Sequence, residues 1–457
     1  MIRVSALVLL GMIGFAGCGG AKVAAPATTA AADVEQDATK PPMPKSATPA
    51  ATKPDFAAYR QHLADANAAY ARKDYAAFLA STERATAALS NSPRAMYNVA
   101  CGYALTGKSA EAIGQLEKLA QMNLYFDVMR DDDLASLRNL PQFTAVFARF
   151  GALEKEVRGT SAPAFTLPER DTIAEGIAHD SQTGAFFVSS VHNRKIIKIL
   201  PGGRAQDFAT KDLFAVLAMA VDAKRRALWA CSSAVPEMKN FQETDKGRAK
   251  IVEFDIDTGN LRQTISLDES GMGHMCNDLA VDGDGTVFVS DPAASMVYTV
   301  PPGGKTLDAL VPRGEFAAPQ GIALTSDGQS IFVADYSRGL FHVDRSSRAV
   351  TWMLPPDDST LVGIDGLVTH RGDLIAIQNG IRPHRVVRIA VDVSAKVVRR
   401  VEILQMNHPA FNEPTLGVVV GKELFYVANS QWGSFDKGVL WPMDKLKEPV
   451  VLKLGLE

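Results

Sequence analysis

Four oxygen-bearing side chains recur at equivalent places in a sequence pattern that repeats from residue 175 to residue 432. They are Glu175, Asn277, Gln320 and Asp365, and a short apolar segment follows each of them. Two carboxylates and two amides are ligands that suit a hard cation such as calcium, with water completing six to eight positions. Histidine does not occur at these places, which disfavours zinc. The sequence therefore predicts a divalent-metal site, with calcium as the metal and these four residues as ligands.

The repeat that carries these residues has six copies. Its first positions are spaced by 42, 60, 43, 45 and 50 residues, and each copy contains short apolar strands joined by turns. Such a period with several strands per copy is typical of β-propeller blades. Since the innermost strand of each blade lines the central channel, the six first positions should form a ring. The ring consists of Glu175, Leu217, Asn277, Gln320, Asp365 and Thr415.

A second set of polar residues ends the following strand of each copy. It consists of Ser190, Ser232, Asp291, Asp335, Asn379 and Asn429. The last four of these are candidates for a substrate pocket beside the metal. The alternative is that both sets only face water in the channel. Sequence alone leaves open whether the two sets lie at the same end.

At these motifs the chain resembles a known family. EGIA at 175, ND at 277, QGIALTSDGQSIFVAD at 320 and DGL at 365 resemble the senescence-marker-protein/gluconolactonase family. The resemblance implies a six-bladed propeller that hydrolyses sugar lactones with one divalent metal, commonly calcium. It also implies that Glu175 and Asp365 are metal carboxylates, that Asp365 doubles as the catalytic base, and that Asn277 contacts substrate near the metal. Gln320 would replace an Asn ligand of the family.

One position departs from the family pattern. Family lactonases often carry an arginine two residues before Asn277, and this chain has Met275 there. Two functions therefore remain. One is a calcium-dependent hydrolase of a lactone or related ester, and the other is a non-catalytic propeller that acts with the helices as a binding or scaffold protein of the cell envelope. In the first, a metal polarises the carbonyl and a carboxylate activates water.

Several basic side chains occur in the loops between strands. A general base could lie at His192, His274 or His384, although a surface role is the commoner one for a lone histidine in a loop. An anionic ligand could meet the basic run near residue 385, but a solvated edge is the favoured interpretation. The run consists of Arg382, His384, Arg385 and Arg388.

The N-terminal segment has the pattern of an export signal. Arg3 precedes an apolar run to Ile13, and the FAGC ending at Cys18 resembles the lipobox of bacterial lipoproteins, in which the cysteine is acylated. The alternative is an ordinary secretory peptide cut near Gly20. Residues 19–54 are rich in Ala, Pro, Thr and Lys and are predicted to be a disordered linker. We therefore expect an exported lipoprotein, periplasmic or attached to the outer membrane, that contacts the membrane through its lipid only.

Residues 55–150 show helical periodicity instead of strand alternation. Aromatic and apolar residues recur every three or four positions, and Tyr70 and Leu105 are equivalent at an offset of 35 residues. This resembles tetratricopeptide repeats. The predicted architecture is thus a tetratricopeptide-like α-helical module followed by a six-bladed β-propeller over residues 160–457. The helices could bind a protein partner, dock on the propeller, or only cap it.

Charge and cysteine content narrow the remaining possibilities. The net charge is −3 and there is no basic stripe, which argues against a nucleic-acid partner. A small-molecule lactone or ester is the expected ligand, if there is one. If Cys18 carries lipid, Cys101, Cys231 and Cys276 remain. A Cys231–Cys276 bridge is conceivable, but buried free thiols are the prediction.

Overall fold

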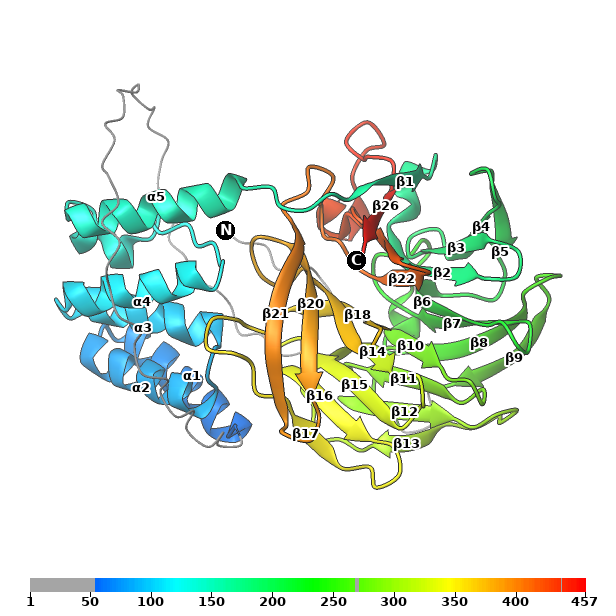
Figure 1. Cartoon of the computed structure of the whole chain (residues 1–457), viewed down its shortest axis with the longest axis horizontal. Coiled ribbons are helices and arrows are strands. Elements are labelled where there is room, and N and C mark those ends of the chain that lie inside the picture. The colour runs from blue at the N-terminus through cyan, green and yellow to red at the C-terminus, as the bar shows by residue number, and fades with distance from the viewer. Residues whose placement is uncertain (1–53, 268–270, 437) are drawn as a thin grey trace.

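The computed structural model describes residues 54–267, 271–436 and 438–457. Two parts are visible in Figure 1, a stack of helices and a wheel of six four-stranded antiparallel sheets. The predicted fold class, an α-helical module followed by a six-bladed propeller, is therefore confirmed. The predicted lipidation site Cys18 and most of the predicted linker lie outside the described residues.

The propeller is built from six blades in chain order, each counted from its innermost strand. Blade one holds β2 (Ala174–Asp180), β3 (Ala185–Ser190), β4 (Lys195–Ile199) and β5 (Ala205–Ala209), and blade two holds β6 (Ala215–Asp222), β7 (Ala227–Ser233), β8 (Ala249–Asp255) and β9 (Leu261–Ser266). Blade three holds β10 (Asp278–Val281), β11 (Val287–Asp291), β12 (Met296–Val300) and β13 (Asp308–Val311), and blade four holds β14 (Pro319–Leu324), β15 (Ser330–Asp335), β16 (Gly339–Asp344) and β17 (Val350–Trp352).

The last two blades close the circle. Blade five holds β18 (Ile364–His370), β19 (Asp373–Gln378), β20 (Arg385–Asp392) and β21 (Val397–Met406). Blade six holds β22 (Gly417–Val420), β23 (Glu423–Val427), β26 (Val450–Gly455) and, as its outer strand, β1 (Ala162–Thr166). The innermost strands contact one another in order, and β22 contacts β2. Pairing of β1 with β26 thus ties the start of the propeller to its end.

Glycines in the repeated motif allow the innermost strands to approach closely. A Cβ atom at Gly321 would lie 2.4 Å from the carbonyl oxygen of Asp365, and one at Gly366 would lie 2.6 Å from that of Thr415. Both distances are far below a normal contact, so a larger residue would push neighbouring blades apart. The glycine after the ring residue in these two copies is therefore required by the packing of one blade on the next.

Two loops extend beyond the regular blades. Residues 234–248 join β7 to β8 and include the short 3₁₀ turn η4 (Glu243–Asp245). This loop accounts for part of the 60-residue spacing between the ring positions Leu217 and Asn277. The segment between β23 and β26 contains η6 (Trp432–Ser434) and a small hairpin of β24 (Phe435–Asp436) and β25 (Val439–Leu440). We call these the blade-two loop and the blade-six hairpin.

A disulfide joins Cys231 to Cys276, so the prediction of free thiols at these positions is wrong. Cys231 lies in β7, and Cys276 lies two residues before the first strand of blade three. Packing of one blade on the next brings their Cα atoms to 5.1 Å, a normal separation for a disulfide. Spacing along the sequence does not reveal this proximity. Cys101 is buried and free.

The helical module consists of helices that pack on one another in chain order. They are α1 (Phe56–Ala71), α2 (Tyr75–Ala88), α3 (Pro93–Leu105), α4 (Ser109–Gln121), the 3₁₀ turn η2 (Asp132–Leu137) and α5 (Pro141–Lys155). Asp55, Asp74 and Ser92 cap the first three by accepting backbone N–H groups. Gly102 of α3 lies against Leu79 of α2. Across the described ranges, no helix has the length and apolar character of a membrane span.

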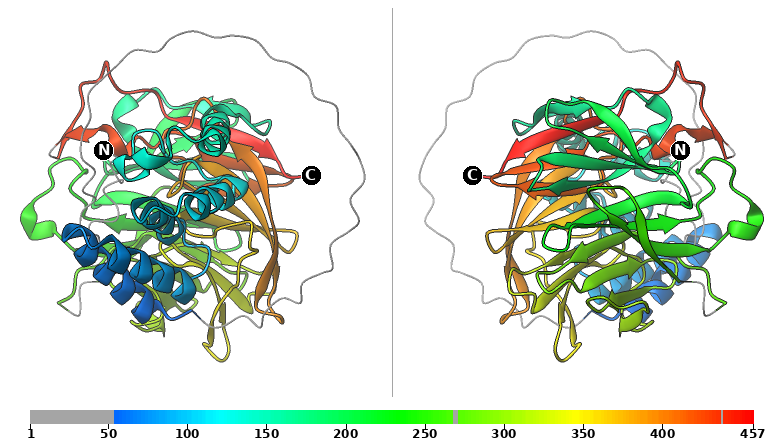
Figure 2. Two further views of the ribbon diagram at one scale, coloured as in Figure 1. Left: turned by 90° about the vertical axis from the view of Figure 1, so that its left-hand side faces the viewer. Right: turned by 90° about the vertical axis from the view of Figure 1, so that its right-hand side faces the viewer.

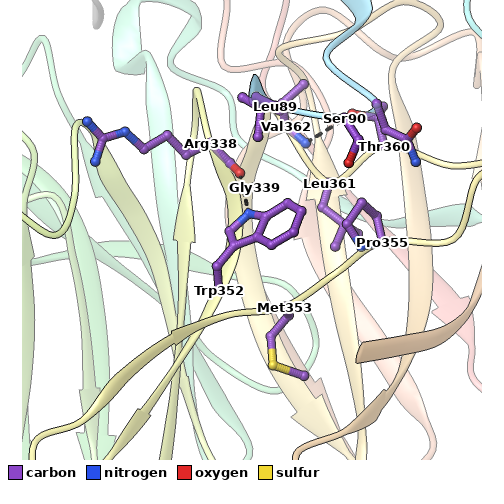
Figure 3. A pocket seen from close by; sticks show the side chains of 11 residues that line it. Leu89, Ser90, Arg338, Gly339, Trp352, Met353, Pro355, Thr360, Leu361 and Val362 are labelled. Atoms are coloured by element: carbon purple, nitrogen blue, oxygen red, sulfur yellow. Dashed lines mark hydrogen bonds between the residues drawn. The ribbon is translucent and has the colours of Figure 1, made fainter. Parts of the chain in front are cut away.

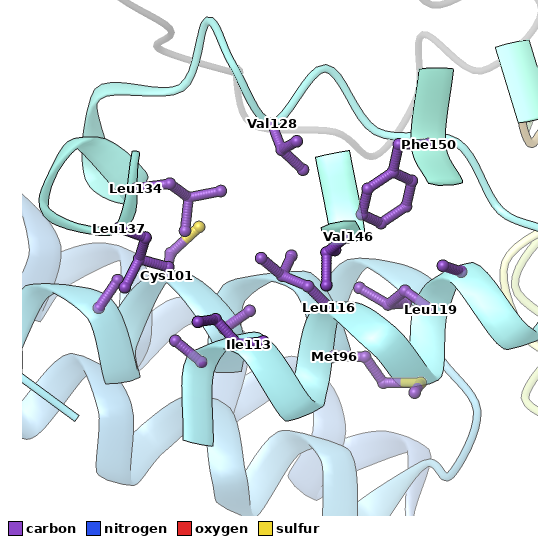
Figure 4. Packing of buried hydrophobic residues seen from close by; sticks show 14 of the residues in the cluster. Met96, Cys101, Ile113, Leu116, Leu119, Val128, Leu134, Leu137, Val146 and Phe150 are labelled. Atoms are coloured by element: carbon purple, nitrogen blue, oxygen red, sulfur yellow. The ribbon is translucent and has the colours of Figure 1, made fainter. Parts of the chain in front are cut away.

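Apolar side chains from the last helices form the core of this module. Leu116 and Leu119 of α4 are fully buried between α3 and α5, where Met96, Val146 and Phe150 pack around them (Figure 4). The same cluster includes Ile381 of blade five. The module therefore shares a core with the propeller and is docked on it.

Polar contacts reinforce this docking on blades four and five. Arg385 is buried at 2% exposure, and it donates to Gln378 Oε1 at 2.7 Å and to the carbonyl oxygen of Met122 at 3.2 Å. The favoured interpretation of this basic run as a solvated edge is therefore wrong for Arg385. Burial and the nearby Arg158 lower its pKa to about 10.

Further contacts lie on either side of Arg385. The N–H of Tyr125 donates to the carbonyl oxygen of Arg382, and Asn407 donates to the carbonyl oxygen of Leu153 at the end of α5. A small pocket at this boundary encloses about 10 Å³, roughly the space of one water molecule. Leu89, Trp352 and Thr360 are among its lining residues (Figure 3). It is too small for a substrate.

Candidate metal centre at one end of the channel

The two predicted rings lie at the same end of the channel. Residues next to the first ring pair with residues at or beside the second, as in Ala174 with Ser190 and Pro319 with Asp335. The register of these pairs shifts beside the ring positions in blades one, two, four and five. Such bulges twist a strand and redirect its side chains. The pairing thus places both rings at one end of the channel, a point that the sequence left open.

Glu175 is buried at this end, with 3% of its surface exposed. Its Oε2 accepts a hydrogen bond of 2.6 Å from the indole Nε1 of Trp432. Burial raises the pKa of Glu175 well above its usual range, the charge of Asp365 raises it further, and the bond from Trp432 opposes the shift. Glu413 and Asp278 also raise this pKa. Several carboxyl groups are therefore close enough at this end to repel one another.

Asp365 lies among the same group, at 5% exposure. Its Oδ2 accepts a hydrogen bond of 2.6 Å from Asn379, whose own Oδ1 accepts one of 2.9 Å from the hydroxyl of Tyr336. Burial raises the pKa of Asp365 to about 7, with the bond from Asn379 opposing and the charge of Glu413 adding to the shift. Asn379 and Tyr336 thus fix the orientation of this carboxyl group.

The two amides contact each other. Asn277 Nδ2 donates to Gln320 Oε1 at 2.5 Å, and both side chains are nearly fully buried. This contact connects blades three and four. At the two remaining ring positions, Leu217 is apolar, and Thr415 donates its hydroxyl to the carbonyl oxygen of Glu175. The structure thus pairs Asn277 with Gln320 and couples Glu175 with Asp365 through their charges.

Four residues at this end were not identified from the sequence. Glu413 lies two residues before a ring position and accepts from the N–H of Gly433 at 3.0 Å, while burial raises its pKa. Asp278 follows Asn277, accepts from the N–H of Ile322, and has a pKa raised by burial to about 7. Tyr336 and Trp432 complete the set. Glu413 and Asp278 could have been found in the sequence, because each is an acidic residue within two positions of a ring residue. No nearby sequence feature indicates Tyr336 or Trp432.

Most of the second ring has local partners in the backbone. Asp335 accepts from the N–H groups of Ala317, Ala318 and Arg338. Asn429 donates to the carbonyl oxygen of Glu448 and accepts from the N–H of Val450. Asp291 accepts from the N–H of Met275 and pairs with His274. Ser190 and Ser232 likewise bond backbone groups of neighbouring loops. Of the predicted pocket residues Asp291, Asp335, Asn379 and Asn429, only Asn379 is bonded to a predicted metal ligand in the described structure.

The loop histidines differ from the surface role that was favoured for them. His274 is buried at 5% exposure, and its Nδ1 lies 2.7 Å from Asp291 Oδ2. His192 is half-buried, with Nδ1 2.6 Å from the carbonyl oxygen of Glu237. His384 is half-buried as well, and burial lowers its pKa to about 4. Loops at the ends of the blades thus partly or fully bury the imidazole rings of these three histidines.

The donor set at the ring fits a hard cation. Carboxyl and amide side chains from blades one, three, four and five lie at this end, and burial together with neighbouring carboxylates raises the pKa of Glu175 and Asp365, a shift that a bound cation would oppose. Within the described ranges, the sulfur of Cys101 and carboxylate oxygens of Asp131 and Asp133 lie within 4.8 Å of one another, and no such group of three His, Cys, Asp or Glu ligand atoms occurs at the ring. A metal at the ring would therefore need the amide oxygens or a shift of the carboxylates.

The cluster around Cys101 has a structural explanation. Asp131 caps η2 by accepting from the N–H of Asp133, and it also accepts from the hydroxyl of Tyr97. Asp133 accepts from the hydroxyl of Tyr70 at 2.7 Å. These aspartates therefore cap a helical turn and tie it to the helices beneath.

Several solved structures match about two thirds of this chain at low sequence identity. A gluconolactonase of Xanthomonas campestris is 17% identical, with 66% of this chain and 91% of that chain covered and a TM-score of 0.44. The calcium-binding protein regucalcin of Agrobacterium tumefaciens is 16% identical over 64% and 94% of the two chains, with a TM-score of 0.46. A luciferin-regenerating enzyme is 13% identical over 65% and 96%, with a TM-score of 0.45. No family model and no curated protein matches the chain. The propeller fold is established here by the strand order and the closure of its blades.

Proposed function

We propose that the propeller hydrolyses a lactone or related ester with the help of one divalent metal, most simply calcium. Glu175, Asn277, Gln320 and Asp365 would hold the metal. The observation that carries the proposal is the pair of buried carboxyl groups, Glu175 and Asp365, each of which accepts from a neutral donor and repels the other. Buried acids that a cation would stabilise are a recurrent property of functional sites.

The residues around the ring have separate roles in this chemistry. A bound divalent cation would supply Lewis-acid polarisation of the ester carbonyl. Asp365 would accept the proton of the attacking water, with Asn379 and Tyr336 holding its carboxyl group in place. Trp432 would hold Glu175. Because the site is buried, water competes little with these interactions.

We further propose that the chain is exported and lipid-anchored at Cys18, which would place the hydrolase in the periplasm or on the outer membrane. The support is the lipobox-like FAGC ending and the composition of residues 19–54. Mass spectrometry of the protein from a membrane fraction tests this point. A diacylated N-terminal cysteine would support it, and an unmodified terminus near residue 20 would overturn it.

The hydrolase proposal is tested by assaying a panel of lactones with calcium and then with a chelator. We expect turnover that the chelator abolishes and calcium restores. Asp365→Ala should lose turnover while it keeps a folded circular dichroism spectrum. Asp308→Ala, which removes an exposed carboxylate on β13, is the matched control and should behave like the wild type.

A second function is favoured by one observation. The helical module is docked on blade five and the segment after it through Arg385, Ile381 and Asn407, and the four predicted metal ligands are only 2–5% exposed. A closed site beside a helical stack suits a binding or scaffold protein of the envelope. Saturable binding of an envelope protein by the helices, with no turnover of any lactone, would support this function over the hydrolase.

A further inference from the structure

We propose that the ligand of this site carries an apolar group, which lies on a wall formed by Leu217, Phe241, Met275, Phe435 and Leu440. We call this surface the apolar wall. The proposal rests on the proposed function for the position of the reacting ester, and it names the substrate class as an ester or lactone with an alkyl, acyl or aryl substituent. A sugar lactone would not fit such a wall.

The apolar wall is continuous with the ring. Leu217 occupies the ring position of blade two, and it belongs to the same packed cluster as Trp432, whose indole donates to Glu175 at 2.6 Å. Met275 lies two residues before Asn277 and packs against this cluster. The wall therefore reaches the ring both at Glu175 and at Asn277.

The outer part of the wall comes from two extended loops. Phe241 belongs to the blade-two loop, whereas Phe435 and Leu440 belong to the blade-six hairpin. All three are half-buried and pack against the same cluster, and the ring of Phe435 lies 5.8 Å from that of His192. Beyond them the hairpin ends in the exposed side chains of Val439 and Trp441. Apolar side chains of one cluster thus extend from Leu217 at the ring to the hairpin.

The opposite side of the ring has a different character. Asp365, Asn379, Tyr336 and Gln320 are polar and come from blades four and five. The contacts of the helical module fall on these blades and on the segment after them. The left view of Figure 2 shows the helices in front of the propeller, with the red blade-six hairpin and the green blade-two loop at one side of it. An entering molecule would therefore meet the apolar wall first and place its carbonyl toward the polar side.

The physical chemistry of the wall selects against hydroxylated ligands. Half-buried apolar side chains gain from covering additional methylene groups, by about fourfold in affinity for each one that is fully buried. The hydroxyl groups of a sugar would lose their bonds to water there without replacement. Met275, two residues before Asn277, offers no strong hydrogen-bond donor to a hydroxyl group. The polar side of the ring would thus bind the ester group through charge and hydrogen bonds, and the apolar wall would bind its substituent.

Binding of 2-alkylcyclopentanones tests the inference independently of turnover. These ketones mimic the ring and carbonyl of a lactone but cannot be hydrolysed. Isothermal titration of the calcium-loaded full chain with the methyl, butyl and hexyl compounds should show affinity rising about two- to fourfold per methylene. Affinity that is equal across the series would overturn the proposal.

Variants then locate the wall. Phe435→Ser combined with Leu440→Ser changes a hairpin that lies outside the blade sheets, so the propeller should still fold. The dependence on chain length should largely disappear in this double variant. Leu261→Ser removes an apolar side chain that is 45% exposed on β9, away from the ring, and should leave the dependence unchanged. An unchanged dependence in the double variant would refute the assigned wall.

The two proposals fail in different ways. Dependence of ketone binding on chain length without turnover of any lactone would keep the apolar site and reject the hydrolase. Turnover of lactones with a flat dependence of both kcat/KM and ketone affinity on chain length would keep the hydrolase and reject the wall. Turnover of sugar lactones in preference to alkyl lactones would also reject the wall.

Discussion

Replacing Asp365 by asparagine should stabilise the metal-free protein at alkaline pH. Burial and the charge of Glu413 raise the pKa of Asp365 from 3.8 to about 7. A shift of about three pKa units corresponds to about 4 kcal/mol in the free energy of unfolding, as an upper figure. The unfolded chain releases this proton above about pH 4 whereas the folded chain keeps it, so folding loses stability between about pH 4 and pH 7. Asparagine has no such proton, and its side-chain oxygen can still accept from Asn379.

The assay is urea unfolding in the presence of a chelator at about pH 8 and about pH 4. At the higher pH, Asp365→Asn should be more stable than the wild type by up to about 4 kcal/mol, and at the lower pH the difference should vanish. Asp335→Asn is the matched control, because that carboxylate accepts several backbone N–H groups and its loss should destabilise the fold at both values. A lower stability of Asp365→Asn at about pH 8 would show that the ionised Asp365 carboxylate does not destabilise the folded metal-free protein.

Three further predictions concern the same end of the channel. Calcium at about 100 times its Kd should stabilise the wild type by about 2.7 kcal/mol near pH 8. The stabilisation should be smaller near pH 5, because protons compete with calcium for Glu175 and Asp365. Thermal unfolding with and without calcium measures both values. Trp432→Phe removes the hydrogen-bond donor to Glu175, so it should lower the free energy of unfolding by about 1–3 kcal/mol and weaken calcium binding. An unaltered calcium affinity would show that this hydrogen bond does not support the metal site. Replacing both Cys231 and Cys276 by alanine should lower the free energy of unfolding by about 2–4 kcal/mol in urea titrations, and an unchanged midpoint would show that the bridge adds nothing.

The propeller and the approximate ring were predictable because they depend on local repetition. The period, the strand alternation and the polar residue at each strand end recur along the sequence, and each is visible without knowledge of the fold. Even the glycine after Gln320 and Asp365 follows from the repeat, although its reason, the carbonyl oxygen of the next blade, appears only in the structure.

Contacts between distant segments could not be predicted in the same way. Trp432 meets Glu175 across the closure of the wheel, 257 residues along the chain, and Arg385 meets Met122 across the boundary between the two parts. The Cys231–Cys276 bridge depends on how one blade packs on the next. Periodicity fixes which residues share a ring, but it does not fix which side chains of other loops fold over that ring.

The most direct test of the central claim is a calcium titration of the metal-free protein by isothermal calorimetry at about pH 8. We expect saturable binding of one ion per chain, which Glu175→Gln and Asp365→Asn each weaken by at least about tenfold and Asp308→Ala leaves unchanged. Absence of saturable binding by the folded wild type would contradict this claim, as would binding that both ring variants retain in full.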